Sequence, residues 1–255
     1  MTSETQPRRK TSRRDLLVGA GTLALVAGGW QLWIQRTRDL VFTPIDHLPG
    51  WKIAQTEGFS APGGSASTAI FLGIGESDAA PEPFAPDDLS FALYSFRFHG
   101  RARLAVFSDF FCPFCRVLTK WLAERASNRK NKLDVVWHEL PLLGPSSVVA
   151  AKAAVAASLQ RRYPAFQGAL LASPFRPSKA FLRDTGLKAG LDPEKLLRDM
   201  ESDTVAARLE RSRRAAETLG IYGTPALTIG RTLVIGQISE GQLDALIADE
   251  RRRTA

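Results

Sequence analysis

The chain has two cysteines, and they stand three positions apart. Cys112 and Cys115 follow the apolar run 104–107 and enclose the dipeptide Pro113-Phe114. The pattern predicts a strand, a tight corner and a helix that begins at Cys112, because a proline in the first helical turn has its φ already set and no N–H to leave unpaired. Cys115 then lies on the same helical face as Cys112, so a reversible disulfide between them is sterically possible.

The start of a helix changes the chemistry of a thiol. Unpaired N–H groups and the positive end of the helix dipole favour a thiolate, and cysteines in such sites have a pKa of roughly 3.5–7 instead of about 8.5. A disulfide whose leaving thiolate is stable is easily reduced, so the pair is predicted to act as an oxidant. We assign Cys112, the more exposed residue in this arrangement, as the nucleophile and Cys115 as the resolving thiol.

Three segments resemble one protein family. Residues 107–115 read Phe-Ser-Asp-Phe-Phe-Cys-Pro-Phe-Cys, residues 139–145 read Glu-Leu-Pro-Leu-Leu-Gly-Pro, and residues 219–226 read Leu-Gly-Ile-Tyr-Gly-Thr-Pro-Ala. In this order and spacing they are similar to the DsbA-like thiol–disulfide oxidoreductases of the thioredoxin superfamily. The resemblance extends over about residues 90–250.

The resemblance implies a second half of the site. It predicts a cis peptide bond between Thr224 and Pro225, packed against the dithiol, and a Thr224 backbone that pairs with the bound polypeptide. From the residue alone, Pro225 could equally be an edge-strand proline, which removes one ladder hydrogen bond. We therefore expect a catalytic, disulfide-forming pair in Cys112 and Cys115, and substrate binding at Thr224 and Pro225.

Two positions depart from the family pattern. Thioredoxins and many DsbA-like proteins carry a buried acid six residues before the first cysteine, a candidate proton acceptor for the resolving thiol, but here that residue is Val106. Asp109 and Glu139 are acids nearby in sequence, yet each is expected to cap a backbone group or to face solvent, so neither is assigned the role. In the active-site dipeptide Pro113-Phe114, Phe114 cannot hydrogen-bond a thiolate as a histidine could, so we expect an oxidising potential that is not extreme.

The elements around the motif predict an α/β domain with a thioredoxin-like fold. Strands are expected at 89–98, 102–108 and 133–139, and a helix at 112–128 lies between the last two. This order gives a right-handed crossover and a parallel strand pair. The cysteines then follow the carboxyl end of a strand, where open α/β sheets place their sites.

Residues 146–218 carry no strand signal and are predicted to be helical. An alanine-rich helix is expected at 146–162 and an amphipathic one at 203–219, and Asp192 followed by Pro193 reads as an N-cap with proline at the first helical position. A separate helical bundle is the alternative. Because the strands on both sides need each other, an all-helical insertion fits better, as the resemblance implies.

The chain after the insertion is expected to complete the sheet. Residues 226–230 and 232–236 read as two short strands of an antiparallel hairpin. Ser239 and Gln242 have the spacing of a capping box, which predicts the start of a last helix.

The N-terminal residues 1–38 resemble an export signal. Residues 11–17 read Thr-Ser-Arg-Arg-Asp-Leu-Leu, as in a twin-arginine signal, and residues 16–34 are uncharged. As a helix this uncharged run would span roughly 28 Å, close to the thickness of a bilayer core. Cleavage and retention as a membrane anchor both fit, and Trp30 and Trp33 favour the anchor. We expect an exported, periplasmic protein, either released or tethered to the inner membrane by residues 16–34.

The chain is thus expected to divide into five segments. A twin-arginine-type signal or anchor at 1–38 precedes a linker or partly docked extension at 39–88, which is rich in Pro, Gly, Ser and Ala. The thioredoxin-like domain follows as a first part at 89–145, the helical insertion at 146–218, and a second part at 219–255.

Charge and ligand spacing argue against nucleic acid and against a metal site. The formal net charge is +8, but residues 1–38 contribute +5 of it, so the excess belongs to the targeting segment. Zinc would need two ligands besides the cysteines. The three histidines are not at metal-ligand spacing: His47, His99 and His138. Neither a metal nor another cofactor is expected.

The residues together predict an exported thiol–disulfide oxidoreductase that oxidises cysteines of secreted polypeptides through Cys112 and Cys115. A membrane redox partner would then reoxidise the dithiol. A disulfide reductase or isomerase of the same compartment is the alternative within this chemistry. In a different class, a thioredoxin fold could serve as a peptide-binding chaperone module, but that function would leave the dithiol dispensable.

Overall fold

The computed structural model describes most of the chain that follows the predicted signal or anchor, and the predicted signal or anchor itself lies outside the described residues. The described ranges are 40–55, 82–94, 101–128, 130, 132–173 and 178–254. None of the helices in these ranges has the length and apolarity that crossing a bilayer requires.

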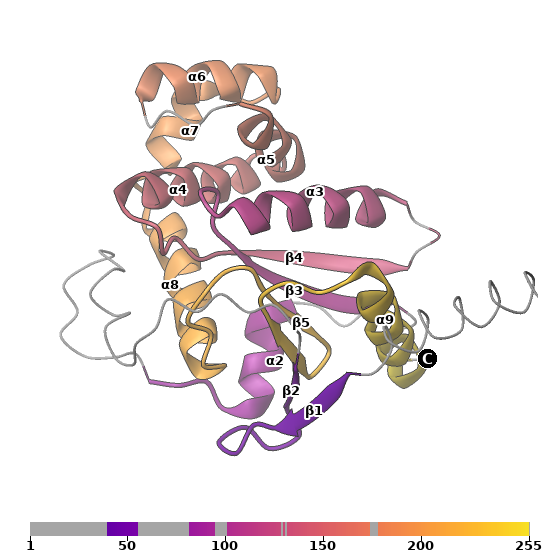
Figure 1. The fold of residues 1–255 in the computed structure, drawn as a ribbon. Helices are drawn as coiled ribbons and strands as arrows, with labels where there is room; N and C mark the ends of the chain where they lie inside the picture. Colours follow the sequence, from indigo (N-terminus) through magenta and orange to yellow (C-terminus); the bar gives the residue numbers. More distant parts are fainter. Residues whose placement is uncertain are drawn as a thin grey trace, which may run out of the picture. The chain divides into compact units, whose positions relative to one another are not determined.

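Strands and helices alternate along the first half of the described chain, and helices dominate the second (Figure 1). The elements are β1 (Val41–Pro44), β2 (Lys52–Gln55), α2 (Pro86–Tyr94), β3 (Ala102–Ser108), α3 (Pro113–Ser127), β4 (Leu133–Glu139), α4 (Pro145–Leu159), α5 (Tyr163–Ala172), α6 (Lys179–Lys188), α7 (Pro193–Asp199), α8 (Asp203–Thr218), β5 (Ala226–Ile229), β6 (Thr232–Ile235) and α9 (Glu240–Thr254).

The sheet has the strand order β1-β2-β6-β5-β3-β4. β3 and β4 are parallel, with Ser108 opposite Glu139, which confirms the crossover predicted from the sequence. β5 runs antiparallel to both β3 and β6, so the predicted hairpin is confirmed as well. Phe107 at the carboxyl end of β3 lies opposite Ala226, so β5 begins beside the residues that lead into the cysteines.

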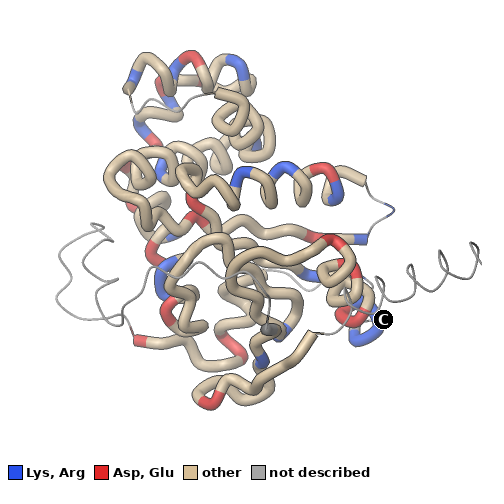
Figure 2. The backbone as a smooth tube through the Cα atoms, in the orientation of Figure 1, with Lys and Arg blue, Asp and Glu red and all other residues tan. Residues whose placement is uncertain are grey.

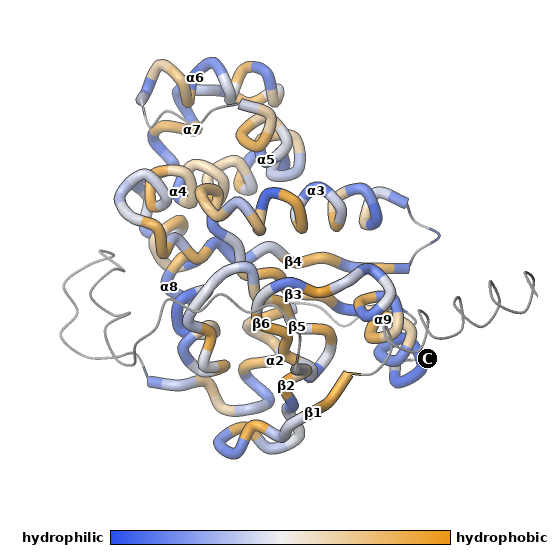
Figure 3. The backbone as a smooth tube through the Cα atoms, viewed as in Figure 1, coloured by the Kyte–Doolittle hydropathy of each residue, from blue (hydrophilic) through white to orange (hydrophobic). Residues whose placement is uncertain are grey.

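The two faces of the sheet have separate apolar cores, because successive side chains of a strand point to opposite faces. Ala105 and Phe107 pack with α2 and α8, whereas Leu104 and Val106 pack with α3 and α9. Figure 3 shows hydrophobic segments along the strands at the centre of the fold. β3 is therefore buried on both faces and holds the cysteine loop on a rigid support.

The predicted all-helical insertion is confirmed, and it has a core of its own. α4 buries Ala150, Ala153 and Ala154 against the other helices of the insertion, and Figure 1 shows α4 to α7 gathered to one side of the sheet. Asp192 is the N-cap of α7, as predicted, and accepts hydrogen bonds from two backbone N–H groups. Small alanine side chains let these helices approach closely.

α8 joins the helical core to the core of the sheet. Its first half buries Val205 and Leu209 in the helical insertion, and its second half buries Ala215 against the sheet. Its exposed side carries alternating charges: Figure 2 shows Lys or Arg interspersed with Asp or Glu along the helices of the described chain. On α8, Arg213 pairs with Glu210, a contact between a partly buried guanidinium and an exposed carboxylate that contributes a few tenths of a kcal/mol.

The strand predicted at 89–98 is wrong: residues 86–94 form the helix α2. Leu89 and Leu93 are buried one helical turn apart, whereas Phe91 between them is 72% exposed. That pattern has the period of a helix, and a strand would have placed all three side chains on one face. Aromatic content suggested β structure, but the amphipathic period decided the local conformation. Residues 95–98 lie outside the described ranges.

Two strands, β1 and β2, occur in the segment for which the sequence predicted a partly docked extension and no strand at these positions. β2 pairs with β6 in parallel, and β1 pairs with β2 at the edge of the sheet. Trp51, which precedes β2, is 2% exposed and packs in the core beside α2 and α8. Strands of four residues are too short to show a clear alternation in sequence.

Candidate functional site

Cys112 lies at the start of α3, as predicted. It is the N-cap residue, Pro113 follows in the first turn, and the Cys112 sulfur accepts a hydrogen bond from the Cys115 backbone N–H at 3.4 Å. Both cysteines are free thiols and both are nearly buried, with 4% of Cys112 and 2% of Cys115 exposed. The helix therefore presents an N–H group to the sulfur that we assigned as the nucleophile.

The Thr224–Pro225 peptide bond is cis and lies beside the cysteines, so the structure has the geometry that the resemblance implied. The Cys112 thiol donates a hydrogen bond to the Thr224 carbonyl at 3.4 Å. The position follows from the sheet, because β5 begins at Ala226, opposite Phe107 at the end of β3. Residues more than a hundred positions apart are thus brought to one end of the sheet.

The two thiols have opposite acidities. The hydrogen bond from the Cys115 side chain, together with hydrogen bonds from the backbone of Cys115 and Phe114 and contact with Thr224, lowers the pKa of Cys112 to about 6 against the opposing effect of burial. The same side-chain hydrogen bond and burial raise the pKa of Cys115 far above its ordinary value. At neutral pH, Cys112 is the thiolate of the pair and Cys115 keeps its proton.

A family model described as the DSBA-like thioredoxin domain matches residues 103–248, which include both cysteines, the helical insertion and the cis-proline loop. The chain belongs to this family. As a member of the DSBA-like thioredoxin family, the protein is a thiol–disulfide oxidoreductase. A comparison with curated protein sequences found no match.

Three solved structures place the DSBA-like domain among similar folds. A thioredoxin-like oxidoreductase from Silicibacter pomeroyi DSS-3 is 30% identical, covers 65% of this chain and 98% of its own, and has a TM-score of 0.58. A periplasmic thioredoxin-like protein from Salmonella enterica serovar Typhimurium is 23% identical over 65% and 97% of the chains, with a TM-score of 0.53. The thiol-disulfide exchange protein alpha-DsbA2 from Wolbachia pipientis is 18% identical over 76% and 100%, with a TM-score of 0.55. At these identities the latter two establish the shared fold.

Asp109 fixes the loop that carries the DSBA-like motif. Its carboxylate is 1% exposed and accepts four hydrogen bonds. The donors are the backbone N–H groups of Phe111 (2.8 Å), Leu142 (2.8 Å) and Leu143 (3.0 Å) and the hydroxyl of Ser147 (2.8 Å). Asp109 therefore caps backbone groups, one of the two roles expected from the sequence, and it ties the cysteine loop to the segment between β4 and α4.

Glu139 was expected to cap or to face solvent, and the structure shows that it is buried. Its carboxyl group is at the end of β4, where the residue is 3% exposed, and it accepts a hydrogen bond from the Tyr163 hydroxyl. Burial raises the pKa of Glu139 to about 8, with a further contribution from the charge of Asp109, while the Tyr163 hydrogen bond opposes the shift. Among the residues that the sequence left unassigned, Glu139 is therefore the strongest addition to the site.

Four exposed apolar side chains come from the loops that meet at the cysteines, and we call them the apolar rim: Phe111, Phe114, Leu143 and Tyr222. Phe111 and Phe114 flank Cys112, the Leu143 N–H binds Asp109, and Tyr222 precedes Thr224 by two residues. Between 36% and 55% of each side chain is exposed. Apolar side chains gathered at a functional site favour binding of an apolar partner surface.

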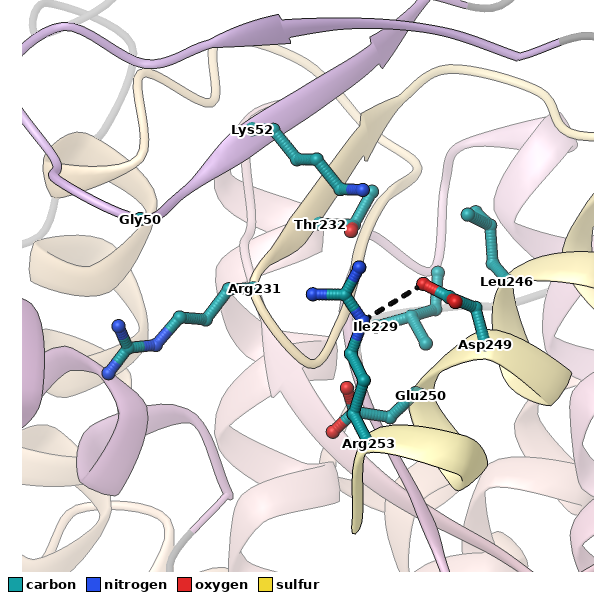
Figure 4. A pocket seen from close by; sticks show the side chains of 9 residues that line it. All are labelled: Gly50, Lys52, Ile229, Arg231, Thr232, Leu246, Asp249, Glu250 and Arg253. Carbon is teal, nitrogen blue, oxygen red and sulfur yellow. Dashed lines mark hydrogen bonds and ion pairs between the residues drawn. The ribbon is translucent and has the colours of Figure 1, made fainter.

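A small pocket lies away from the cysteines, where β5, β6 and α9 meet (Figure 4). Its wall includes Ile229, which pairs with Leu104 in the amino-terminal half of β3, whereas Cys112 follows the carboxyl end of that strand. The charged groups that line the pocket have partners, such as Arg253 with Asp249. Within the described ranges, no cluster of three or more His, Cys, Asp or Glu residues could hold a metal ion.

Proposed function

We propose that this oxidoreductase works as an oxidant, which transfers its Cys112–Cys115 disulfide to cysteine pairs of exported polypeptides. The observation that carries the proposal is the pKa of Cys112, lowered to about 6 chiefly by the hydrogen bond from Cys115. A stable Cys112 thiolate stabilises the reduced protein, so reduction of the Cys112–Cys115 disulfide becomes more favourable. This asymmetry favours oxidation of substrates over their reduction.

The exchange has two steps. A substrate thiolate attacks the Cys112 sulfur, which forms a mixed disulfide and breaks the Cys112–Cys115 bond, and the departing Cys115 sulfur takes up a proton. A second substrate thiolate then attacks the substrate sulfur of the mixed disulfide and expels Cys112 as a thiolate. The substrate has lost two electrons and the protein has gained them as a dithiol. A membrane redox partner must remove those electrons before the next cycle.

The substrate is proposed to be a polypeptide in an extended conformation. The Thr224 backbone, next to the cis bond and within hydrogen-bond distance of Cys112, is the group that would pair with a bound chain. The apolar rim would contact side chains near the substrate cysteine, because these side chains are exposed in unfolded polypeptides and buried in folded ones. Recognition of this kind would select unfolded polypeptides over folded ones and would accept substrates of many different sequences.

The compartment is proposed to be the periplasm. The similar protein from Salmonella enterica is described as periplasmic, and the sequence of residues 1–38 resembles an export signal that would be retained as a tether or cleaved. An oxidising compartment is also where a disulfide donor has substrates.

Trapping with single-cysteine variants tests the proposal. Oxidised wild-type protein, mixed with a reduced peptide that carries two cysteines, should convert the peptide to its disulfide form. Cys115→Ser should accumulate a mixed disulfide with a peptide activated as an aromatic disulfide, whereas Cys112→Ser should form none. If Cys112→Ser oxidised the peptide as fast as the wild type, the exchange would not occur at this site. If the equilibrium left the peptide reduced, the direction would be that of a reductase.

A further inference from the structure

Cys115 needs a proton partner, and the position that supplies one in many related proteins is apolar here. The pKa of Cys115 is raised, so its sulfur carries a proton as a free thiol and none as part of a disulfide. This proton is therefore given and taken up on each redox cycle, and a neighbouring acid would speed the transfer. Val106, six residues before Cys112, has no titratable side chain.

The register of β4 places Glu139 on the same face of the sheet as α3. Side chains of a strand alternate between faces, and His138 belongs to the opposite face, where it stacks on Phe107 at a ring-centroid distance of 4.9 Å. Trp137 packs against the core that α3 covers. Glu139, two residues after Trp137 and opposite Ser108, therefore lies on the α3 face at the carboxyl end of β4.

Asp109 borders both Cys115 and Glu139. The Cys115 thiol makes a hydrogen-bond contact with the Asp109 backbone, and the Asp109 carboxylate acts electrostatically on the Glu139 carboxyl group. The resolving thiol and the buried acid thus lie on either side of one residue.

Asp109 itself is already committed to other bonds. Its two carboxylate oxygens receive three backbone N–H groups and the Ser147 hydroxyl. These bonds use the Asp109 carboxylate to hold the loop that carries Cys112. Glu139 differs, because within the described part of the chain the Tyr163 hydroxyl is the one group that hydrogen-bonds its carboxyl. One Glu139 oxygen therefore stays available for a proton.

We propose that the Glu139 carboxyl group, positioned by the Tyr163 hydroxyl, exchanges the proton of the Cys115 thiol during the disulfide cycle. The proposal rests on the thiol–disulfide exchange proposed above. When a substrate thiolate breaks the Cys112–Cys115 bond, Glu139 gives its proton to the departing Cys115 sulfur and becomes a carboxylate. When the dithiol is reoxidised, the Glu139 carboxylate takes the proton as Cys115 attacks the mixed disulfide on Cys112.

The surroundings of Glu139 suit this role. The titratable groups that act on it are the Asp109 carboxylate from the loop after β3 and the Tyr163 phenol of α5. The pKa of Glu139, raised by burial to about 8, leaves the carboxyl mostly protonated at neutral pH and still able to ionise. An acid or base is most effective when its pKa lies near the working pH.

The reduced protein and the aromatic disulfide 5,5′-dithiobis(2-nitrobenzoate) provide a test in two phases. The Cys112 thiolate displaces the first coloured thiolate, and Cys115 displaces the second when it closes the protein disulfide. In Glu139→Gln, which keeps the shape and can still accept the Tyr163 hydrogen bond, we expect the second phase to slow at least about tenfold at pH 7. The rise of its rate around pH 8 should also disappear, while the first phase keeps its rate and its dependence on the pKa of Cys112.

Two further variants complete the design. Tyr163→Phe keeps the ring that stacks on Trp137 and removes the hydroxyl, so the inflection of the second phase should move in pH without being lost. Glu250→Gln removes a different buried carboxyl, one that lies towards the amino end of β3, and should leave both phases unchanged. A reduced-minus-oxidised infrared difference spectrum should contain a protonated-carboxyl band that Glu139→Gln abolishes.

Three results would overturn the proposal. The first is an unchanged rate of the second phase in Glu139→Gln. The second is a first phase that slows in proportion to the second, which would mean that Glu139 only shapes the loop. The third is a protonated-carboxyl infrared band that survives the substitution. A wild-type protein that shows no second phase would refute the exchange chemistry of the proposed function instead. The two failures are therefore distinguishable in the same experiment.

Discussion

At the amino end of β3, the buried Glu250 carboxylate accepts two hydrogen bonds from the Arg103 guanidinium, at 2.9 and 3.2 Å. At the carboxyl end, the equally buried Glu139 carboxyl has the Tyr163 hydroxyl and no basic partner among the described residues. The first arrangement fixes a carboxylate with a basic partner, whereas in the second burial raises the pKa of the acid to about 8. The comparison shows how one sheet combines a structural end with a reactive end.

The amino end is also closed sterically. The Tyr94 hydroxyl donates to the Gly230 carbonyl at 2.6 Å and lies 2.7 Å from the Thr228 hydroxyl, so the tyrosine ties α2 to β5. Gly230 has a φ of +56°, and a Cβ atom there would lie 2.0 Å from a Glu250 oxygen. The Glu250 side chain therefore leaves no room for a larger residue at position 230. At the carboxyl end, by contrast, the apolar rim is exposed beside the thiols.

Among substitutions compared at one fixed pH, the largest effect on this contrast is expected from Asp109→Ala. The variant leaves three backbone N–H groups and the Ser147 hydroxyl without their buried acceptor, which should lower the free energy of unfolding by about 3–4 kcal/mol. Exchange activity should fall with it, because the cysteine loop loses its anchor. Urea unfolding and the trapping assay measure the two losses. A loss below about 1 kcal/mol would show that the loop holds its shape without Asp109.

A smaller effect, confined to stability, is expected from Glu250→Gln. Loss of the carboxylate leaves the Arg103 guanidinium, which is 22% exposed, without its charged partner, and should cost about 2 kcal/mol of unfolding free energy. The alkylation profile of Cys112 with pH should not change in the folded variant. A shift in that profile would mean that the two ends of the strand are coupled, which would break the comparison.

The effects of pH, which build up gradually over several pH units, have opposite signs for two neighbours on β4. The folded protein holds the Glu139 proton up to about pH 8, whereas an unfolded glutamate loses it near 4.5, so the stability that Glu139 contributes is fully present below pH 4.5 and is lost as pH rises towards 8. Burial lowers the pKa of His138 from 6.5 to about 4, so its contribution is present above pH 6.5 and is lost as pH falls towards 4.

Differences between variants isolate these contributions. Relative to Glu139→Gln, the wild type should lose up to about 1.4 kcal/mol of unfolding free energy per pH unit between pH 4.5 and 8. Relative to His138→Gln, the wild type should lose unfolding free energy as the pH falls from 6.5 to 4, whereas the Glu139 effect appears as the pH rises. Chemical unfolding at a series of pH values checks both slopes. Parallel curves for wild type and Glu139→Gln would show that the Glu139 carboxyl is ionised when folded.

Sequence alone was sufficient for the elements that local signals define. The sequence predicts the strands at 102–108 and 133–139 with the bounds that the structure shows, because each contains an apolar run that is followed by turn residues. The starts of α3 and α9 could also be predicted, because helix caps depend on residues close in sequence. Pro113 lies in the first turn of α3, and Ser239 and Gln242 hydrogen-bond each other at the start of α9.

The rest depends on contacts between distant residues. The sequence predicts a strand where α2 forms because aromatic residues occur in both kinds of element. It does not predict β1 and β2, because strands of four residues show no clear alternation and β2 joins the sheet through β6, far along the chain. The burial of Glu139 had no signal of its own, since Tyr163 comes from a helix of the insertion. Its position at the end of an apolar strand could have suggested burial, but only the fold places this acid at the same end of the sheet as the thiols.

The measurement that tests the central claim most directly is the reduction potential of the Cys112–Cys115 pair at equilibrium with glutathione, taken together with the pKa of Cys112 from its rate of alkylation. An oxidant with a stabilised Cys112 thiolate should have a potential between about −200 and −120 mV and a thiol pKa near 6. A potential near −270 mV, about that of thioredoxin, with an ordinary thiol pKa would contradict the assignment of this protein as a disulfide donor.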